Sequence, residues 1–222
     1  MGLLPCLSRN TILLIKFDNP CIKRYHRFKR KSVCSYCSHW WIMLCLLMGF
    51  TRSSSKKKMK EVLFMRHAKA CQATFHQSDH ERSLTNSGIK EVESMSKFIK
   101  SKKFIPDIML VSDSKRTQET WKYLNKELNN TLSKFDKDLY LASPKTLINK
   151  IMNLDNLLDS VIILAHNPGI TDVFNDYFNI KLDHMPTCGV GCIEFHTDKF
   201  ENILDCTSKL KYLSYPSLIN NG

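Results

Sequence analysis

From Met59 to the C-terminus, short apolar runs alternate with amphipathic stretches. Three runs have the length and composition of buried strands, at 62–64, 108–111 and 161–164. The stretches between them repeat apolar residues every three or four positions, which is the spacing along one face of a helix. Strands that alternate with helices predict a mostly parallel sheet covered on both faces. We therefore expect an α/β protein built as a three-layer α/β/α sandwich.

Helix-starting residues stand where the amphipathic stretches begin. Ser114 is the expected N-cap of one helix, Ser143 and Pro144 begin another, and Pro168 suits the first position of a third. A further helix is expected to carry Ile89, Val92, Met95 and Ile99 on one face. Extended segments are expected at 139–141, 190–195 and 210–213.

Charged and polar residues follow each of the three predicted buried strands. Arg66 and His67 come directly after the first, Arg116 lies just beyond the second, and His166 follows the third. Open α/β sheets bind ligands at the carboxyl ends of their strands. Arg116 would also lie in the first turn of a helix, where free backbone N–H groups favour an anion. Two arginines and two histidines at one edge of the sheet suit an oxyanion with several negative charges, and phosphate is the expected ligand.

Five motifs in order resemble the histidine phosphatase superfamily, and specifically its small phosphohistidine phosphatase branch, the SixA type. Any one of them alone would be a weak signal, whereas five in the right order are a strong one. The motifs are 66–70, 79–85 with Gly88, 112–120, 166–169 and 185–187. The resemblance implies a phosphoglycerate mutase-like fold and no cofactor.

The resemblance and the residue types together suggest the chemistry. A neutral imidazole is a good nucleophile near pH 7, so His67 is expected to attack phosphorus and form a covalent phosphohistidine that water then hydrolyses. Arg66 and Arg116 are the expected clamps on the phosphate oxygens, and His166 adds a donor. Arg82 is placed among the substrate-binding residues mainly by the resemblance. No metal is expected, because no carboxylate cluster stands at the strand ends.

The leaving group needs a proton, and larger, mutase-like members of the superfamily supply a carboxylate for it after the third strand. Here 136–142 contains no glutamate, and Asp138 is a weak candidate. A phosphorylated imidazole leaves as neutral imidazole once its other nitrogen is protonated, whereas an alkoxide leaves badly without an acid. We therefore expect a phosphohistidine substrate on a histidine phosphotransfer domain or phosphocarrier protein. A small-molecule phosphomonoesterase and a non-catalytic phosphate-binding module remain as alternatives.

Charge divides the chain near residue 58. Residues 1–58 carry 12 Lys and Arg against the single acid Asp18, whereas 59–222 carry 21 against 20 acids. The near-neutral second part gives no support for nucleic-acid binding. We expect a histidine phosphatase domain at 59–222, behind a basic, cysteine-rich N-terminal extension, in a cytoplasmic protein with reduced thiols.

Two interpretations of residues 1–58 stay open. Met59 leads at once into the first strand, which favours Met59 as the real start and an over-extended gene model before it. Alternatively, the uncharged stretch 32–51 anchors the protein in a membrane, although only 40–50 is densely apolar. Cys34, Cys37 and His39 make half a zinc site at best, because no second ligand pair follows at a suitable spacing.

Overall fold

The computed structural model describes residues 59–73, 75 and 77–220. The expectations for the 32–51 stretch and for the Cys34–Cys37 pair with His39 lie outside these residues. A domain that begins at Met59 therefore stays a prediction. Within the described ranges, no helix is both long enough and apolar enough to cross a membrane.

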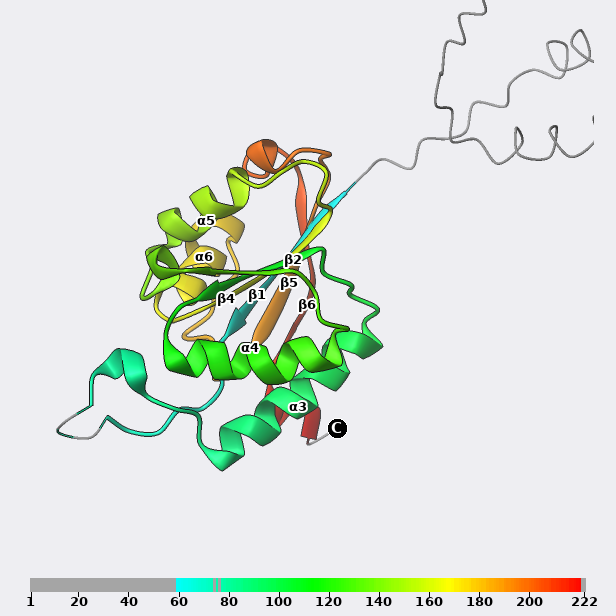
Figure 1. Ribbon diagram of the computed structural model, residues 1–222. Coiled ribbons are helices and arrows are strands. Elements are labelled where there is room, and N and C mark those ends of the chain that lie inside the picture. The colour runs from blue at the N-terminus through cyan, green and yellow to red at the C-terminus, as the bar shows by residue number, and fades with distance from the viewer. Residues whose placement is uncertain (1–58, 74, 76, 221–222) are drawn as a thin grey trace, which may run out of the picture. The chain divides into compact units, whose positions relative to one another are not determined.

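A mixed sheet of six strands forms the centre of the described residues. Its strands are β1 (Lys60–Arg66), β2 (Ile108–Ser112), β3 (Ser133–Asp136), β4 (Ser160–Ala165), β5 (Val190–Phe195) and β6 (Ser208–Ser214). They lie in the order β3-β2-β4-β1-β5-β6 (Figure 1). The first four run parallel, whereas β5 and β6 pair in antiparallel fashion. The predicted mostly parallel sheet is confirmed, with two antiparallel strands at one edge.

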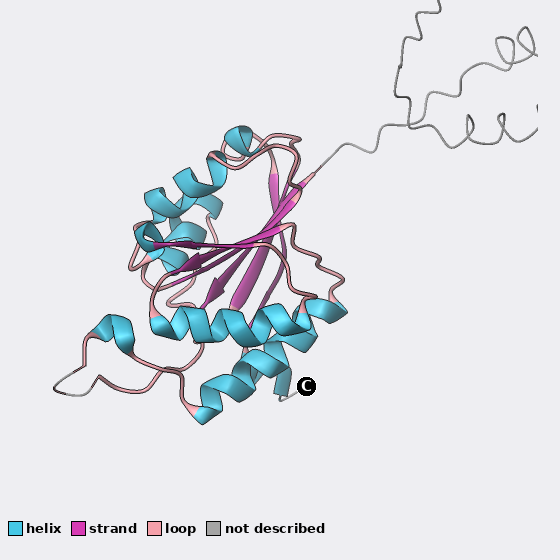
Figure 2. Cartoon of the chain, viewed as in Figure 1, coloured by secondary structure: helices cyan, strands magenta, loops and turns pink. Residues whose placement is uncertain are grey.

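Helices cover both faces of this sheet (Figure 2). They are α3 (Asn86–Ser101), α4 (Lys115–Glu127), α5 (Pro144–Met152), α6 (Gly169–Phe178) and the short α7 (Pro216–Asn220). Alternate side chains of β1 point to opposite faces of the sheet. Val62 and Phe64 pack with α5 and α6 on one face, whereas Leu63 and Met65 pack with α3 and α4 on the other. The predicted three-layer sandwich is confirmed.

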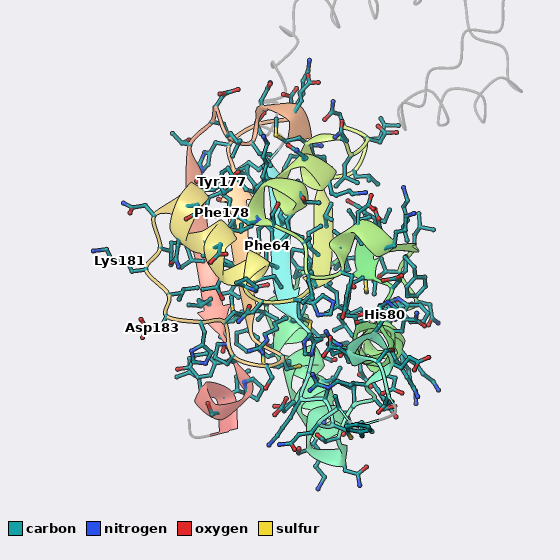
Figure 3. All side chains as sticks on the ribbon, turned by 90° about the vertical axis from the view of Figure 1, so that its left-hand side faces the viewer. Phe64, His80, Tyr177, Phe178, Lys181 and Asp183 are labelled. Atoms are coloured by element: carbon teal, nitrogen blue, oxygen red, sulfur yellow. The ribbon has the colours of Figure 1, made fainter. Side chains whose placement is uncertain are left out.

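The predicted helical faces and helix starts are largely correct. In α3, Val92, Met95 and Ile99 are fully buried, which fits their helical spacing. The Ser143 side chain caps α5 by accepting from the Thr146 amide. On the face of the sheet opposite α3, aromatic residues of α6 pack against β1. The ring centroids of Phe178 in α6 and Phe64 in β1 are 6.3 Å apart (Figure 3).

The predicted extended segment at 139–141 is wrong. The edge strand is β3, six residues earlier, and Lys137–Leu139 form a 3-10 turn (η2) that begins where the Asp136 carboxylate accepts from the Asp138 amide. Among the described residues, β3 pairs only with β2 and is partly exposed, so its sequence has no apolar run to reveal it. Leu139 is apolar because it is buried in the core.

A buried lysine begins β1 at the amino end of the sheet. The Lys60 side chain is fully buried, and its ammonium donates to the carbonyls of Asn156 and Leu158 and lies 3.0 Å from the Asp159 carboxylate. These acceptors precede β4, so Lys60 ties the amino ends of β1 and β4 together. The buried charge is tolerated because each of its hydrogens has an acceptor.

Candidate active site

The carboxyl ends of β1, β2 and β4 lie side by side, because β4 pairs with both of the other strands. Arg66 at the end of β1 stands opposite Ala165 at the end of β4, and the His67 amide donates to the Ala165 carbonyl at 3.2 Å. The structure therefore brings Arg66, His67, Arg116 and His166 to one cavity of about 420 Å³, as the sequence predicts. We call this cavity the phosphate pocket, after the ligand that its strand-end residues are expected to bind.

The lining of the phosphate pocket is mainly cationic. It consists of Arg66, His67, Lys69, Ala70, Asp79, Arg82, Arg116, Leu141, His166, Asn167 and Thr187. Three arginines and a lysine face a single carboxylate, so the pocket suits an anion with more than one negative charge. Among the described residues, no group of three or more His, Cys, Asp or Glu side chains is arranged to hold a metal ion.

His67 has one ring nitrogen committed to the backbone and the other directed at Arg116. Its Nδ1 lies 2.8 Å from the Ala68 carbonyl, which only accepts, so Nδ1 carries the hydrogen. The lone pair on Nε2 receives a hydrogen bond from Arg116 Nε at 3.2 Å. Burial lowers the pKa of His67 to about 4, and the charges of Arg116 and Arg66 act in the same direction. His67 is thus a neutral imidazole at pH 7, with its nucleophilic nitrogen in the pocket.

His166 is held in the opposite tautomer. Its Nδ1 lies 3.3 Å from Arg116 Nη2, which only donates, so Nδ1 is the acceptor and Nε2 carries the hydrogen. Nε2 lies 2.9 Å from the Ser112 hydroxyl and 3.4 Å from that of Ser114. Burial, followed by the nearby His67 and Arg116, lowers the pKa of His166 to about 2. Ser114 does stand at the N-cap of α4, but its hydroxyl bonds Thr117 and faces His166 instead of capping the helix.

The two predicted clamps differ in their surroundings. Arg116 is 3% exposed and donates to both histidines, to the Asp79 carbonyl and to the Asp79 carboxylate. Arg66 donates through Nη1 to the Met185 carbonyl at 2.8 Å, while its buried Nε has no hydrogen-bond partner within the described part of the chain. A buried donor without a partner is costly, so Arg66 is well suited to gain an oxygen acceptor from a ligand.

The loop between β1 and α3 adds three further charged residues to the pocket, Lys69, Asp79 and Arg82. Its 3-10 turn is Asp79–Glu81 (η1), and Figure 3 labels His80 within it. His80 joins this turn to the residues after β2, because its Nε2 lies 3.0 Å from the Asp113 carboxylate. Arg82 lines the pocket, as the resemblance predicts, and donates to Asp79 Oδ1 at 2.8 Å. Its Nε donates to the Cys71 carbonyl at 2.6 Å, so Arg82 braces the loop as well.

Asp79, which lines the pocket, and Tyr140, which bonds Asp79, are two residues that the sequence did not identify as functional. The Tyr140 hydroxyl donates to Asp79 Oδ2 at 2.7 Å, and Arg116 Nη2 donates to the same oxygen at 3.0 Å. The hydrogen bond from Tyr140, followed by that from Arg82, holds the pKa of Asp79 far below its usual range. The sequence contains one signal for Asp79, because Asp79 lies in the same motif, 79–85, as the predicted substrate-binding residue Arg82.

Asp138, the weak candidate for the acid, lies outside the pocket lining. Its carboxylate is half exposed and bonds Lys150 at 2.7 Å. Lys150 also bonds Asp136, so Asp138 belongs to a surface ion-pair network around η2. The structure thus brings a different carboxylate, Asp79, to the pocket.

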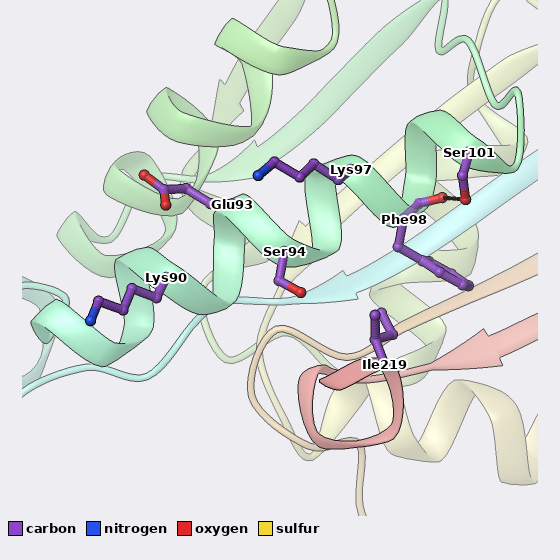
Figure 4. Close-up of a pocket in the computed structure, with 7 residues that line it drawn as sticks. All are labelled: Lys90, Glu93, Ser94, Lys97, Phe98, Ser101 and Ile219. Atoms are coloured by element: carbon purple, nitrogen blue, oxygen red, sulfur yellow. Dashed lines mark hydrogen bonds between the residues drawn. The ribbon is translucent and has the colours of Figure 1, made fainter. Parts of the chain in front are cut away.

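A second cavity, of about 440 Å³, lies between α3 and α7 (Figure 4). It is lined by Lys90, Glu93, Ser94, Lys97, Phe98, Ser101 and Ile219. These residues include neither a histidine nor an arginine, and none of them lies at the carboxyl ends of β1, β2 and β4. The phosphate pocket, which collects the strand-end residues, is therefore the candidate active site.

Comparisons with known proteins agree with the fold. Residues 62–139 match the family model of the histidine phosphatase superfamily (branch 1), and no curated protein matches the chain. A protein histidine phosphatase SixA complexed with tungstate has a TM-score of 0.62 at 19% identity, covering 72% of this chain and 99% of its own. A protein from Nakamurella multipartitia assigned as phosphohistidine phosphatase SixA has a TM-score of 0.63 at 16% identity, covering 71% and 96%.

The same fold occurs in an enzyme with a different substrate. A mycobacterial glucosyl-3-phosphoglycerate phosphatase has a TM-score of 0.53 at 12% identity, covering 68% of this chain and 97% of its own. At these identities the likeness to solved structures shows the fold alone. The substrate has to be inferred from the pocket itself.

Proposed function

We propose that the chain is a member of the histidine phosphatase superfamily, whose family model matches residues 62–139, and that it acts as a phosphohistidine phosphatase. It works without a metal, through a covalent phosphohistidine on His67. The observation that carries this proposal is the hydrogen bond from His67 Nδ1 to the Ala68 carbonyl, which leaves the Nε2 lone pair facing the cationic pocket. The proposed substrate is a phosphorylated histidine phosphotransfer domain or phosphocarrier protein. We place the activity in the cytoplasm, where thiols such as Cys188 and Cys192 stay reduced.

In the proposed reaction, His67 Nε2 forms a bond to phosphorus as the bond to the leaving group breaks. Phosphoryl transfer depends mainly on positioning and charge stabilisation, which Arg66 and Arg116 supply by holding the equatorial oxygens. Arg116 Nε already points at Nε2, so the same guanidinium meets both the nucleophile and the phosphate. Water then attacks the phosphorus, which releases orthophosphate and returns His67 to its neutral form.

The leaving group favours phosphohistidine over an alkyl phosphate. Among the described residues of the pocket lining, the carboxylate is Asp79, and its hydrogen bonds with Tyr140 and Arg82 keep it ionised, so it has no proton to give. An alkoxide therefore has no evident acid in the pocket, whereas an imidazole protonated on its other nitrogen leaves neutral.

Rapid-quench labelling tests the covalent step. The full chain would be mixed with a ³²P-labelled, histidine-phosphorylated phosphocarrier protein, quenched in alkali, which preserves phosphohistidine, and digested for mapping. We expect transient label on His67 and no turnover by His67→Ala. Label on His166 would reverse the roles of the two histidines.

A substrate panel tests the substrate class with the same protein. Phosphohistidine on protein, 3-phosphoglycerate, glucose 6-phosphate and p-nitrophenyl phosphate would be compared by kcat/KM. We expect phosphohistidine to exceed both alkyl phosphates by orders of magnitude. Comparable turnover of 3-phosphoglycerate would make the protein a metabolite phosphatase, and no turnover of any substrate would leave a phosphate-binding module.

A further inference from the structure

Asp79 has an unusual position for a carboxylate. It lines the phosphate pocket, where the other charged residues are lysine and arginine, and it is the one acidic side chain among the described residues that line it. A carboxylate beside a phosphate site repels the phosphate, so its presence calls for a compensating role. The hydrogen bonds of Asp79 and the chemistry of the leaving group together indicate what that role is.

The carboxylate of Asp79 has room for one more donor. Its Oδ2 accepts from Tyr140 and Arg116, and its Oδ1 accepts from Arg82. An ionised carboxylate has about four acceptor positions, so one on Oδ1 is left over. The side chain is 46% exposed, which makes this position accessible from the mouth of the pocket.

The Arg116 guanidinium spans the gap between the nucleophile and this carboxylate. It donates through Nε to His67 Nε2 at 3.2 Å and through Nη2 to Asp79 Oδ2 at 3.0 Å. A phosphoryl group held by Arg116 would lie beside both. In-line displacement places the leaving group on the side of phosphorus away from His67. Asp79, which bonds a different nitrogen of Arg116 from the one that meets His67, would border that side.

We propose that Asp79 determines substrate specificity by accepting a hydrogen bond from the N–H of the departing imidazole. This inference rests on the proposed function and names the group that recognises phosphohistidine. His67 Nε2 forms the new P–N bond, and the electron pair of the old P–N bond returns to the substrate nitrogen. The imidazole departs as a neutral molecule. Its other nitrogen keeps its proton, which the hydrogen bond to the Asp79 carboxylate stabilises there.

The same carboxylate disfavours other phosphate compounds. A substrate with its own carboxylate, such as 3-phosphoglycerate, would place two negative charges side by side at the pocket mouth. An ester with an alkoxide leaving group would find an acceptor where it needs a donor. Tyr140, Arg82 and Arg116 keep the pKa of Asp79 too low for it to act as the missing acid.

The test compares Asp79→Asn with wild type in the full chain on two substrates. One is a histidine-phosphorylated phosphocarrier protein, whose leaving imidazole presents an N–H. The other is p-nitrophenyl phosphate, whose leaving phenolate needs no proton and has no N–H. We expect kcat/KM on phosphohistidine to fall about 10- to 100-fold, the factor for losing one hydrogen bond to a charged group. On p-nitrophenyl phosphate the loss should be much smaller, because this leaving group makes no hydrogen bond to Asp79, so the ratio of the two kcat/KM values should fall.

Asp138→Asn is the matched control, since Asp138 is a half-exposed carboxylate that bonds Lys150 outside the pocket. It should leave both rates, and their ratio, close to those of wild type. Equal losses on both substrates in Asp79→Asn would mean that Asp79 only supports Arg116, and the inference would fail while the proposed function stands. Wild type that hydrolyses p-nitrophenyl phosphate but not phosphohistidine would refute the proposed function, and this inference with it.

Discussion

Replacing Arg116 by lysine removes the directed hydrogen bonds of the guanidinium from the pocket while keeping the positive charge. The guanidinium is 3% exposed and makes directed contacts to His67 Nε2, His166 Nδ1 and Asp79. A lysine ammonium is a point charge on a longer, flexible stem and cannot reproduce this fork. Arg116→Lys should therefore lose the bidentate contact to phosphate and the alignment with His67.

The size of the loss follows from the number of hydrogen bonds. Each one to a charged group is worth about 1.5–3 kcal/mol, so losing two costs about 3–6 kcal/mol. A factor of ten corresponds to about 1.4 kcal/mol, which predicts that kcat/KM falls about 10²- to 10⁴-fold. Orthophosphate affinity should weaken by at least about tenfold, because one of these bonds is made in the ground state.

Two measurements check this prediction. Initial rates on p-nitrophenyl phosphate give kcat/KM, and titration calorimetry gives the Kd for orthophosphate. Lys115→Ala is the control, because Lys115 is the exposed neighbour of Arg116 in α4 and should change both values less than twofold. A loss below fivefold in a folded Arg116→Lys protein would show that charge alone is enough, and that the bidentate reasoning is wrong.

Two further predictions concern the residues around the histidines. In Gly169→Ala, the new Cβ would lie 2.0 Å from the Ala142 carbonyl oxygen. We therefore expect at least about 2 kcal/mol of destabilisation in urea unfolding, and a lower kcat because His166 shifts. An unchanged midpoint of urea unfolding would contradict this prediction. The pKa of His67 is lowered to about 4, so as the pH falls below about 6.5 its imidazole is protonated in the unfolded chain before it is protonated in the folded protein. Wild type should therefore lose about 2–3 kcal/mol more stability than His67→Ala between pH 7 and pH 4. Parallel profiles of stability against pH for the two proteins would refute the lowered pKa.

The sequence predicted the sheet and the strand-end residues because both depend on short, local patterns. Buried strands such as β4 read as apolar runs, and the residue after each run lies at the edge of the sheet wherever the neighbouring strands are in register. β3 was not predicted, because the prediction of strands depends on such apolar runs. It is an edge strand with one partner, and its partly exposed residues carry no apolar pattern.

Asp79 and Tyr140 show the limit of this approach. They lie 61 residues apart and meet through a hydrogen bond of 2.7 Å, which no spacing along the chain encodes. The resemblance to larger, mutase-like members of the superfamily predicted that any acid would lie in 136–142. The structure brings a carboxylate from the loop before α3 instead, and 136–142 contributes Tyr140, which bonds it.

The direction of β1 has a practical consequence for attaching this protein to a surface. The strand runs from Lys60, which is tied to the residues before β4, to Arg66 at the pocket. Seven residues of extended chain separate these two ends by about 20 Å. A tether placed at Met59 would therefore leave from the end of the sheet opposite the pocket. A sensor built that way would turn its binding face toward the solution, where a phosphorylated protein can reach it.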